Sequence, residues 1–254
     1  MVPRISVCVF VLIFVSELFA QVDQTSPERM TGKLLVNGRD VGSAFLVGDN
    51  GHKAAILSAA HCVPGDLRQS GVEIVFIPGA YRDRFGVVQA PYGRFVCGQT
   101  IRMNQEWFKY KDCVEGDDYL TRARMDFVVL ELNRSPRLGY FAVTTGEPNV
   151  ALFTAGYAKI ANGRLWKGVA EQPEFFDSWM FRCNGPVPKE LKGASGGPFY
   201  FRNAQGRLIA FAIHTGVGLA DDPRQGHRRI TAEVVEQIRG VFGWSGSNRL
   251  ATTR

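Results

Sequence analysis

Apolar residues in this chain gather in short runs of four to eight residues, separated by Gly, Asn, Asp and Pro. Runs of this length that are rich in β-branched and aromatic residues predict β-strands. The first half of the chain contains five such runs, at 33–36, 43–47, 54–58, 72–77 and 127–132. The second half contains four, at 150–157, 178–183, 198–201 and 208–214. The pattern therefore predicts a chain dominated by strands.

Helical periodicity is convincing in only one segment, near the end of the chain. Thr231 stands there at a helix N-cap position, and apolar residues recur at steps of three and four: Ala232, Val234, Val235, Ile238 and Val241. Residues 133–136 interrupt the strand pattern and predict a connection between two halves. Many short strands and one terminal helix predict an all-β fold, either a sandwich or a pair of barrels. Residues 243–254 are polar and small and predict a flexible tail.

The composition is that of an ordinary globular protein. The 254 residues include 28 Gly and 12 Pro, which is too few for a collagen-like or low-complexity chain, so we expect a stable core. The formal charge of +6 favours acidic surfaces or substrates electrostatically, but it carries no information about the fold.

The first twenty residues have the pattern of a signal peptide. Arg4 supplies a positive start, residues 5–15 are apolar, and Ala20 precedes a plausible cleavage point. The apolar run ends at Ser16, short of the about 20 residues that a bilayer-spanning helix needs. We therefore expect residues 1–20 to be removed, the mature protein to be secreted or periplasmic, and the chain to carry no membrane anchor.

Once Cys8 is removed with the signal peptide, four cysteines remain: Cys62, Cys97, Cys113 and Cys183. Export favours two disulfides, and four cysteines allow three pairings, among which a short loop closed by Cys97 and Cys113 is preferred. The absence of a CxxC pair speaks against zinc, and the acidic segment 115–118 lacks EF-hand spacing. We therefore expect no metal and no other cofactor.

A basic cluster near the C-terminus contains Arg224, His227, Arg228 and Arg229. No aromatic residues are interleaved with these charges, and no nucleic-acid-binding motif surrounds them. We therefore interpret the cluster as a solvated face and expect no nucleic-acid partner.

Three sites with the residue types of nucleophilic catalysis follow one another in the order His, Asp, Ser. His61 follows the apolar run 54–57, Asp126 immediately precedes the run 127–132, and Ser195 lies between glycines. Taken singly, each has an ordinary structural interpretation, because such histidines are often structural, aspartates often begin strands, and Gly-rich turns are common. The combination points to acyl transfer, in which a serine hydroxyl needs a base to take its proton.

Glycines beside the serine serve a second need of acyl transfer. Gly193, Gly196 and Gly197 permit backbone torsions that other residues resist, so the hydroxyl can project and neighbouring N–H groups can turn toward one point. The tetrahedral oxyanion requires such preorganised donors.

The three blocks LSAAHC, MDFVVLEL and GASGGPFY resemble, in the same order, the catalytic blocks of the chymotrypsin-like serine peptidases, and the resemblance extends roughly from residue 42 to residue 242. It implies two antiparallel six-stranded β-barrels with a C-terminal α-helix. Residues 21–135 would form the N-terminal barrel, which carries the His and the Asp. Residues 136–242 would form the C-terminal barrel, which carries the Ser.

The resemblance also implies a role for each catalytic group. His61 would act as general base and then as general acid, Asp126 would orient its ring, and Ser195 would attack the carbonyl. The N–H groups of Gly193 and Ser195 would form the oxyanion hole. The substrate would be a protein or a peptide, and we expect a monomer.

Two departures separate this chain from the digestive and clotting members of the family. Those members carry an Asp just before the nucleophile, which pairs with an amino terminus released at an IVGG-like sequence, whereas this chain has Ala194 and no IVGG. There is also no cysteine between residues 21 and 61 to pair with Cys62. The chain is more similar to the bacterial-type secreted branch that includes the glutamyl endopeptidases.

The segment FAIHTGVG strengthens this second resemblance. In glutamyl endopeptidases a histidine in a similar IHT context binds the acidic side chain of the substrate, which implies a substrate-binding role for His214 together with Thr215 and Gly216. Lys189 and Lys192 would add positive potential. The structural alternative is a histidine whose nitrogens bond to neighbouring backbone.

Two other classes of function compete with the peptidase interpretation. The first is a catalytically silent homologue that uses the same cleft to bind a partner, although the intact His–Asp–Ser set speaks against it. The second is an exported β-sandwich interaction module with a chance serine motif, which requires three coincidences.

Overall fold

The structure is a computed structural model that describes residues 26–64, 71–113, 116–158, 161–175, 177–184, 192–219 and 222–243. The predicted signal peptide (1–20), Lys189 and residues 244–254 of the predicted tail lie outside the described residues. Within the described part of the chain, every helix is too short or too polar to cross a bilayer.

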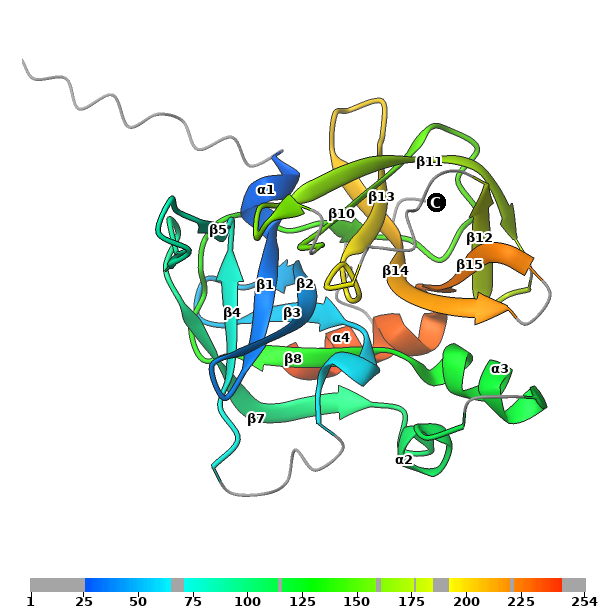
Figure 1. Cartoon of the computed structure of the whole chain (residues 1–254), viewed down its shortest axis with the longest axis horizontal. Coiled ribbons are helices and arrows are strands. Elements are labelled where there is room, and N and C mark those ends of the chain that lie inside the picture. The colour runs from blue at the N-terminus through cyan, green and yellow to red at the C-terminus, as the bar shows by residue number, and fades with distance from the viewer. Residues whose placement is uncertain are drawn as a thin grey trace, which may run out of the picture.

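The first half forms a closed six-stranded barrel, on the left in Figure 1. Its strand order is β1-β2-β3-β8-β7-β4, and every neighbouring pair is antiparallel. The elements of this half are α1 (Pro27–Met30), β1 (Thr31–Val36), β2 (Arg39–Asp49), β3 (Ala54–Ser58), the 3-10 helix η1 (Ala60–Cys62), β4 (Ile74–Pro78), β5 (Tyr81–Arg82), β6 (Val88–Gln89), β7 (Phe95–Met103), α2 (Trp107–Tyr110), α3 (Gly116–Met125) and β8 (Val128–Leu132).

The second half is a curled sheet of seven strands in the order β13-β10-β11-β12-β15-β14-β9. A further pairing of β13 with β14 brings the sheet back on itself, while the short β9 runs parallel to β14. Its elements are β9 (Ala142–Val143), β10 (Leu152–Gly156), β11 (Trp166–Phe175), β12 (Met180–Asn184), β13 (Pro198–Arg202), β14 (Leu208–Leu219), β15 (Asp222–Arg229) and α4 (Ala232–Phe242).

These observations confirm the predicted all-β fold class with a C-terminal helix, and the first half is the predicted six-stranded antiparallel barrel. The second half differs in detail from the predicted six-stranded barrel, because it is a curled sheet of seven strands in which β9 pairs in parallel with β14. Each of the nine predicted runs overlaps a strand, and the run 54–58 coincides with β3. The longer strands that the pattern missed are β7, β11 and β15, in which glycines, prolines or charges interrupt the apolar run. The connection predicted at 133–136 leads from β8 toward β9, while the division into two domains stays a prediction.

The expectation of a single helix is wrong, because α1, α2 and α3 precede α4. Two of them are only four residues long. The third, α3, has the polar sequence GDDYLTRARM, in which Ala123 is the one fully buried residue among 120–125. Periodicity could not reveal α3, since it has almost no apolar face.

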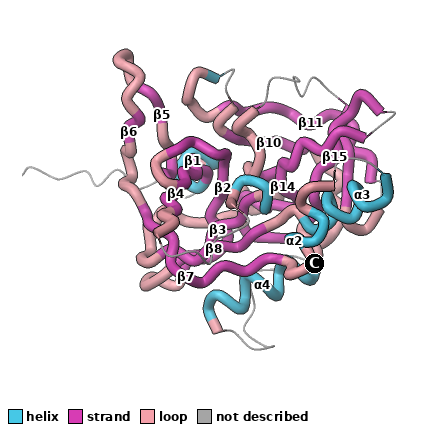
Figure 2. Tube along the Cα trace, turned by 60° about the horizontal axis from the view of Figure 1, so that its bottom comes forward, coloured by secondary structure: helices cyan, strands magenta, loops and turns pink. Residues whose placement is uncertain are grey.

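The terminal helix α4 links the end of the chain to the first barrel. Val234, Val235, Ile238 and Val241 are buried in the same core as the residues of β3 and β8. Figure 2 shows α4 beside β7, and close contacts join the helix to β7 and β8. Thr231 occupies the predicted N-cap position, but its hydroxyl makes no capping bond to the helix and accepts a hydrogen bond of 3.3 Å from Arg228. The C-terminal segment therefore helps to hold the two halves together.

All four cysteines of the described residues are free thiols, so the prediction of two disulfides, including Cys97 with Cys113, is wrong for this structure. Cys62 and Cys183 are buried in two separate apolar clusters. Cys97 lies in β7 opposite Leu132, and Cys113 follows α2. Burial in apolar surroundings raises the pKa of the Cys97 and Cys183 thiols to about 12, which disfavours their thiolates.

Replacement of a core residue of α4 tests how much the helix contributes. Ile238 is fully buried, so Ile238→Ala should lower the free energy of unfolding by about 2–5 kcal/mol through lost burial and the cavity that remains. Urea unfolding measures this change. Glu236→Ala, on the exposed face of the same helix, is the control and should cost less than about 1 kcal/mol. Equal costs for the two variants would contradict the packing of α4.

Candidate active site

Adjacent antiparallel strands bring His61 and Asp126 together. His61 lies in η1 just after β3, Asp126 lies just before β8, and the two strands pair with Ser58 opposite Val128. The Nδ1 of His61 lies 2.6 Å from Oδ2 of Asp126. The backbone N–H of His61 donates to the other carboxylate oxygen at 2.9 Å. Both oxygens of Asp126 are thus used to orient the imidazole.

Asp126 also sets the charge state of His61. The carboxylate of Asp126 is buried, whereas 28% of the His61 side chain is exposed. Burial of the ring is the largest single influence and disfavours the imidazolium, but the negative charge and hydrogen bond of Asp126, together with the interaction with Cys62, outweigh it and hold the pKa of His61 well above its usual value. The ring therefore behaves as a strengthened base with one open side.

Ser195 lies in a tight loop that leads into β13. Gly193 and Gly196 flank this loop in the left-handed region, with φ of 98° and 86°. The carbonyl of Ser195 accepts a hydrogen bond from the backbone N–H of Ser43 at 2.7 Å and lies 3.6 Å from Sγ of Cys62. Since Cys62 follows His61 in the chain, the structure brings all three predicted catalytic segments to one place.

The glycines of this loop are required by close approaches as well as by torsion. A Cβ on Gly193 would lie 2.5 Å from the carbonyl oxygen of Tyr157, and one on Gly196 would lie 2.0 Å from that of Ser43. Within the described residues, the N–H groups of Gly193 and Ser195 donate to no acceptor, and Ser195 Oγ makes no hydrogen bond to His61. Among the described residues, the two N–H groups predicted to form the oxyanion hole therefore have no acceptor.

His214 lies in β14 directly beside the Ser195 loop. Its carbonyl accepts from the N–H of Gly196 at 2.7 Å, and its own N–H donates to the carbonyl of Gly197 at 2.8 Å. The imidazole stacks on Phe199 with a centroid distance of 5.8 Å and lies 4.8 Å from the ring of His227. Neither ring nitrogen of His214 has a hydrogen-bond partner among the described residues.

Burial governs the charge of these two histidines. It lowers the pKa of His214 to about 4, and the positive charge of His61 acts in the same direction. Burial likewise lowers the pKa of His227 well below its usual value. His214 is therefore a neutral hydrogen-bonding group at neutral pH and not a cation.

The other predicted pocket residues have different surroundings. Thr215 is buried, and its hydroxyl donates to the carbonyl of Gly226 at 3.3 Å. Gly216 has φ of 64° where the pairing of β14 with β15 shifts. Lys192 is exposed, and Lys189 lies outside the described residues.

The interpretation of the basic cluster as a solvated face is wrong. His227, Arg228 and Arg229 are all buried in β15, and the side chain of Arg224 is not among those described. The guanidinium of Arg228 lies over the rings of Phe127 at 5.3 Å and Trp179 at 4.8 Å. It donates to the carbonyl of Arg229 at 2.6 Å. Aromatic faces and carbonyl oxygens compensate this charge, as water does at a surface.

Arg228 is also part of the electrostatic environment of the candidate site. Burial lowers the pKa of Arg228 to about 10, although the negative charges of Glu233, Asp177 and Asp126 oppose that shift. Phe127, which lies under the guanidinium, directly follows Asp126 in the chain. A buried cation from the second half thus stands near the carboxylate that orients His61.

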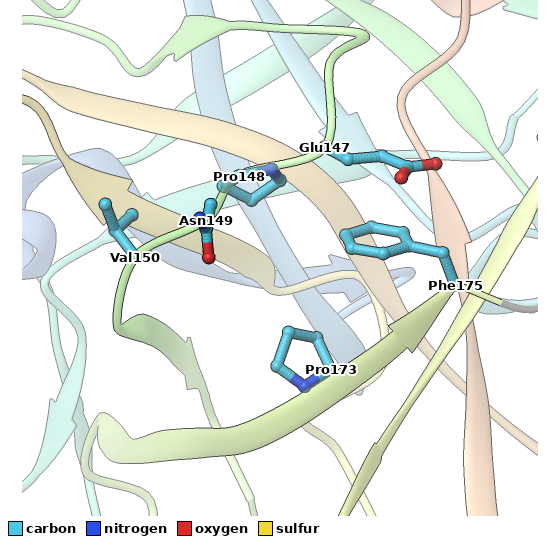
Figure 3. Close-up of a pocket in the computed structure, with 6 residues that line it drawn as sticks. All are labelled: Glu147, Pro148, Asn149, Val150, Pro173 and Phe175. Carbon is cyan, nitrogen blue, oxygen red and sulfur yellow. The ribbon is translucent and has the colours of Figure 1, made fainter.

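A separate pocket of about 460 Å³ lies in the second half, and Figure 3 shows its lining. Arg229 supports two of its walls, because it donates to Oε1 of Glu147 at 2.8 Å and lies 4.9 Å from the ring centroid of Phe175. The lining comprises Glu147, Pro148, Asn149, Val150, Pro173 and Phe175, none of which is a predicted site residue. Among the described residues, no group of three or more His, Cys, Asp or Glu is placed to hold a metal ion.

Comparisons with known proteins agree with this geometry at the level of the fold. No model of a protein family and no curated protein matches the chain. A structure of a Glu endopeptidase in complex with MPD aligns with a TM-score of 0.60 and 16% identity, over 87% of this chain and 94% of that one. The structure of a thermostable serine protease, AL20, from an extremophilic microorganism aligns with a TM-score of 0.59 and 16% identity, over 84% and 96%. The chain therefore has the chymotrypsin-like serine peptidase fold.

The buried state of His214 predicts a specific dependence of stability on pH. The unfolded chain binds a proton on this histidine below about pH 6.5, whereas the folded protein binds it only near pH 4, so unfolding becomes easier as the pH falls across this range. His214 accounts for a loss of about 3 kcal/mol in the free energy of unfolding as the pH falls across this range, and His214→Leu should remove that loss. Urea unfolding at both ends of the range measures it, with His52→Leu at an exposed site as control. An identical pH dependence in wild type and His214→Leu would contradict the prediction.

Proposed function

We propose that this protein is a serine endopeptidase that hydrolyses peptide bonds through an acyl-enzyme, with His61, Asp126 and Ser195 as its catalytic residues. The observation that carries the proposal is the hydrogen-bonded pair of His61 and Asp126 beside the loop of Ser195. The fold shared with solved serine peptidases supports the same reaction class. A substrate in the cleft would bring the hydroxyl and the imidazole into hydrogen-bonding contact, as catalytic groups often tighten only in the complex.

In the proposed reaction, Oγ of Ser195 attacks the scissile carbonyl carbon while Nε2 of His61 takes the hydroxyl proton. The carbonyl oxygen becomes an oxyanion that accepts hydrogen bonds from the N–H groups of Gly193 and Ser195. His61 then protonates the leaving amine, and the C–N bond breaks to give the acyl-enzyme. A water molecule, deprotonated by His61, releases the acid product and restores Ser195. Asp126 stabilises the imidazolium in both halves of the reaction.

We also propose that the enzyme acts outside the cytoplasm and prefers an acidic residue on the acyl side of the cleaved bond. The pattern of residues 1–20 supports export. The position of His214 supports the preference, because its backbone bonds directly to the Ser195 loop and its ring nitrogens have no partner among the described residues. A carboxylate beside this neutral imidazole would raise its pKa and favour uptake of a proton on binding.

A fluorophosphonate probe tests the proposed nucleophile. The wild type should be labelled, and Ser195→Ala should lose the label while keeping its fold, because only an activated serine reacts with such a probe. A folded wild type that is not labelled would favour the alternative of a silent homologue that binds a partner in this cleft.

The pH profile of hydrolysis tests the proposed base. Since only neutral His61 can accept the proton, kcat/KM should rise as the pH rises through the pKa of His61, which Asp126 holds above 6.5. Asp126→Asn should move this limb to lower pH and reduce kcat by about 10⁴-fold, as loss of the orienting carboxylate does in a related triad. Steady-state kinetics on a peptide substrate measure both effects. A limb that stays in place in Asp126→Asn would exclude His61 as the base.

Matched substrates test the proposed specificity. Peptides that differ only in Glu or Gln on the acyl side should differ in kcat/KM in favour of Glu, and His214→Leu should reduce that ratio by about 10–100-fold, since an unpaired carboxylate in the pocket is costly. Hydrolysis of the Gln peptide is the internal control. A preference for Arg, Lys or a large apolar residue in the wild type would overturn the assignment.

A further inference from the structure

Ser43 is a buried residue of the first barrel that is hydrogen-bonded to the second half of the molecule and to the neighbouring strand β3. It is fully buried in β2. Its hydroxyl donates to the carbonyl of Gly193 at 2.8 Å and accepts from the N–H of Tyr157 at 2.8 Å. Its own N–H donates to the carbonyl of Ser195 at 2.7 Å, and its carbonyl accepts from the hydroxyl of Ser58 at 2.7 Å. Both roles of the hydroxyl, donor and acceptor, are therefore filled.

These bonds act on the peptide groups that matter for an oxyanion hole. The peptide group between residues 193 and 194 lies between the two groups that carry the N–H of Gly193 and the N–H of Ser195. When its carbonyl is fixed by Ser43, the torsions on either side are restricted. The bond from the Ser43 N–H to the Ser195 carbonyl fixes the far end of the same segment. The segment that carries both donors is thus held at two points by one residue.

Ser43 is also bonded to the backbone segment that leaves no room for a side chain at position 193. Gly193 has φ of 98°, and a Cβ there would lie 2.5 Å from the carbonyl oxygen of Tyr157. Tyr157 is the residue whose N–H donates to Ser43 Oγ. One hydroxyl therefore ties the loop to the backbone segment against which the loop packs.

The residue before the nucleophile offers no alternative support of this kind. Ala194 is fully buried and packs against Ala158, with Trp166 beside it. Its methyl group has no charge with which to pair and no group with which to donate. In this position an ion pair would be desolvated at considerable cost, whereas a neutral hydroxyl with both roles filled carries no such penalty.

We propose that Ser43 is a positioning residue that orients the N–H groups of Gly193 and Ser195 for an oxyanion, in place of the ion pair that Ala194 cannot make. This inference rests on the proposed function, since it assigns the support of the same site. The inference goes beyond the proposed function because it assigns the support of the oxyanion hole to a single hydroxyl, that of Ser43 in the first barrel.

Kinetics of Ser43→Ala test the proposal, because the variant leaves the Gly193 carbonyl without its donor. We expect kcat to fall by about 10²-fold with KM little changed, since small misplacements of preorganised groups have effects of this size. The affinity for a peptide boronate, which mimics the tetrahedral state, should fall in parallel with kcat/KM. A merely structural role would lower stability without this selective loss, so an unchanged kcat in folded Ser43→Ala overturns the proposal.

Two further variants separate positioning from folding. Ser135→Ala is the matched control, because it also removes a serine hydroxyl that donates a 2.7 Å bond, to Asp49, on the connection between the halves. Because its hydroxyl bonds to Asp49 and not to the 193–195 segment, Ser135→Ala should keep kcat within about twofold. Ser43→Cys keeps a side chain of similar size but offers only a weak donor, and it carries the test if Ser43→Ala does not fold. Wild-type kcat in Ser43→Cys would overturn the proposal.

Crystal structures of the wild type and Ser43→Ala distinguish failure of this proposal from failure of the proposed function. If the wild type neither hydrolyses peptides nor reacts with a fluorophosphonate, the proposed function fails. The orientation of the loop then decides the role of Ser43 by itself. We expect the Gly193 carbonyl to turn away from β2 in Ser43→Ala. An unchanged 193–195 backbone in the variant would overturn the positioning role.

Discussion

The hydrogen bond from the N–H of Ser43 to the carbonyl of Ser195, 2.7 Å long, joins the two halves of the molecule at the candidate site. His61 and Asp126 belong to the barrel of the first half, and Ser195 belongs to the curled sheet of the second half. A site divided in this way has useful geometry only if the two halves keep a fixed relation, because reactivity falls steeply with displacement of the reacting groups. The loop glycines let the backbones approach closely enough for the bond to form. The helix α4 reinforces the relation by packing the C-terminal segment on the first barrel.

The candidate site also contains buried charged groups and buried imidazole rings. Asp126 is buried and bonded to the His61 ring, and Phe127, which follows it in the chain, lies under the guanidinium of Arg228, which also lies over the ring of Trp179. His214 and His227 lie in the same interior and are kept neutral by it. Low local polarity strengthens the interactions among such groups and makes an unpaired polar atom costly. The unpaired nitrogens of His214 therefore support the proposed role in binding an acidic side chain.

The fold and the positions of three residues could be predicted from the sequence. Short apolar runs identified strands such as β3, and the motifs around His61, Asp126 and Ser195 indicated groups that the structure gathers in one region. Short local patterns were enough to locate these three residues, because each residue lies next to a strand that the apolar pattern identifies. The nucleophilic role of Ser195 and the oxyanion hole stay predictions.

Other features could not be predicted, because they depend on contacts between distant segments. Nothing in the local sequence distinguishes Ser43 from any strand serine, since its partner Gly193 lies 150 positions away. His227 and Arg228 looked like surface charges, and only the packing of β15 against aromatic rings reveals their burial. The sequence of 222–229, DPRQGHRR, has no alternation of apolar and polar residues that could have predicted a strand. The free state of the four described cysteines likewise depends on their separation in three dimensions, which local sequence does not reveal.

A crystal structure of the protein after reaction with a peptide phosphonate is the most direct test of whether His61, Asp126 and Ser195, which come from different halves of the molecule, form one catalytic site. We expect a bond from phosphorus to Oγ of Ser195 and a phosphoryl oxygen about 2.7–3.1 Å from the N–H nitrogens of Gly193 and Ser195. We also expect His61, still bonded to Asp126, to face the phosphorus. Phosphorus on another residue, or a phosphoryl oxygen directed into solvent away from both N–H groups, would show that these groups do not form one catalytic site.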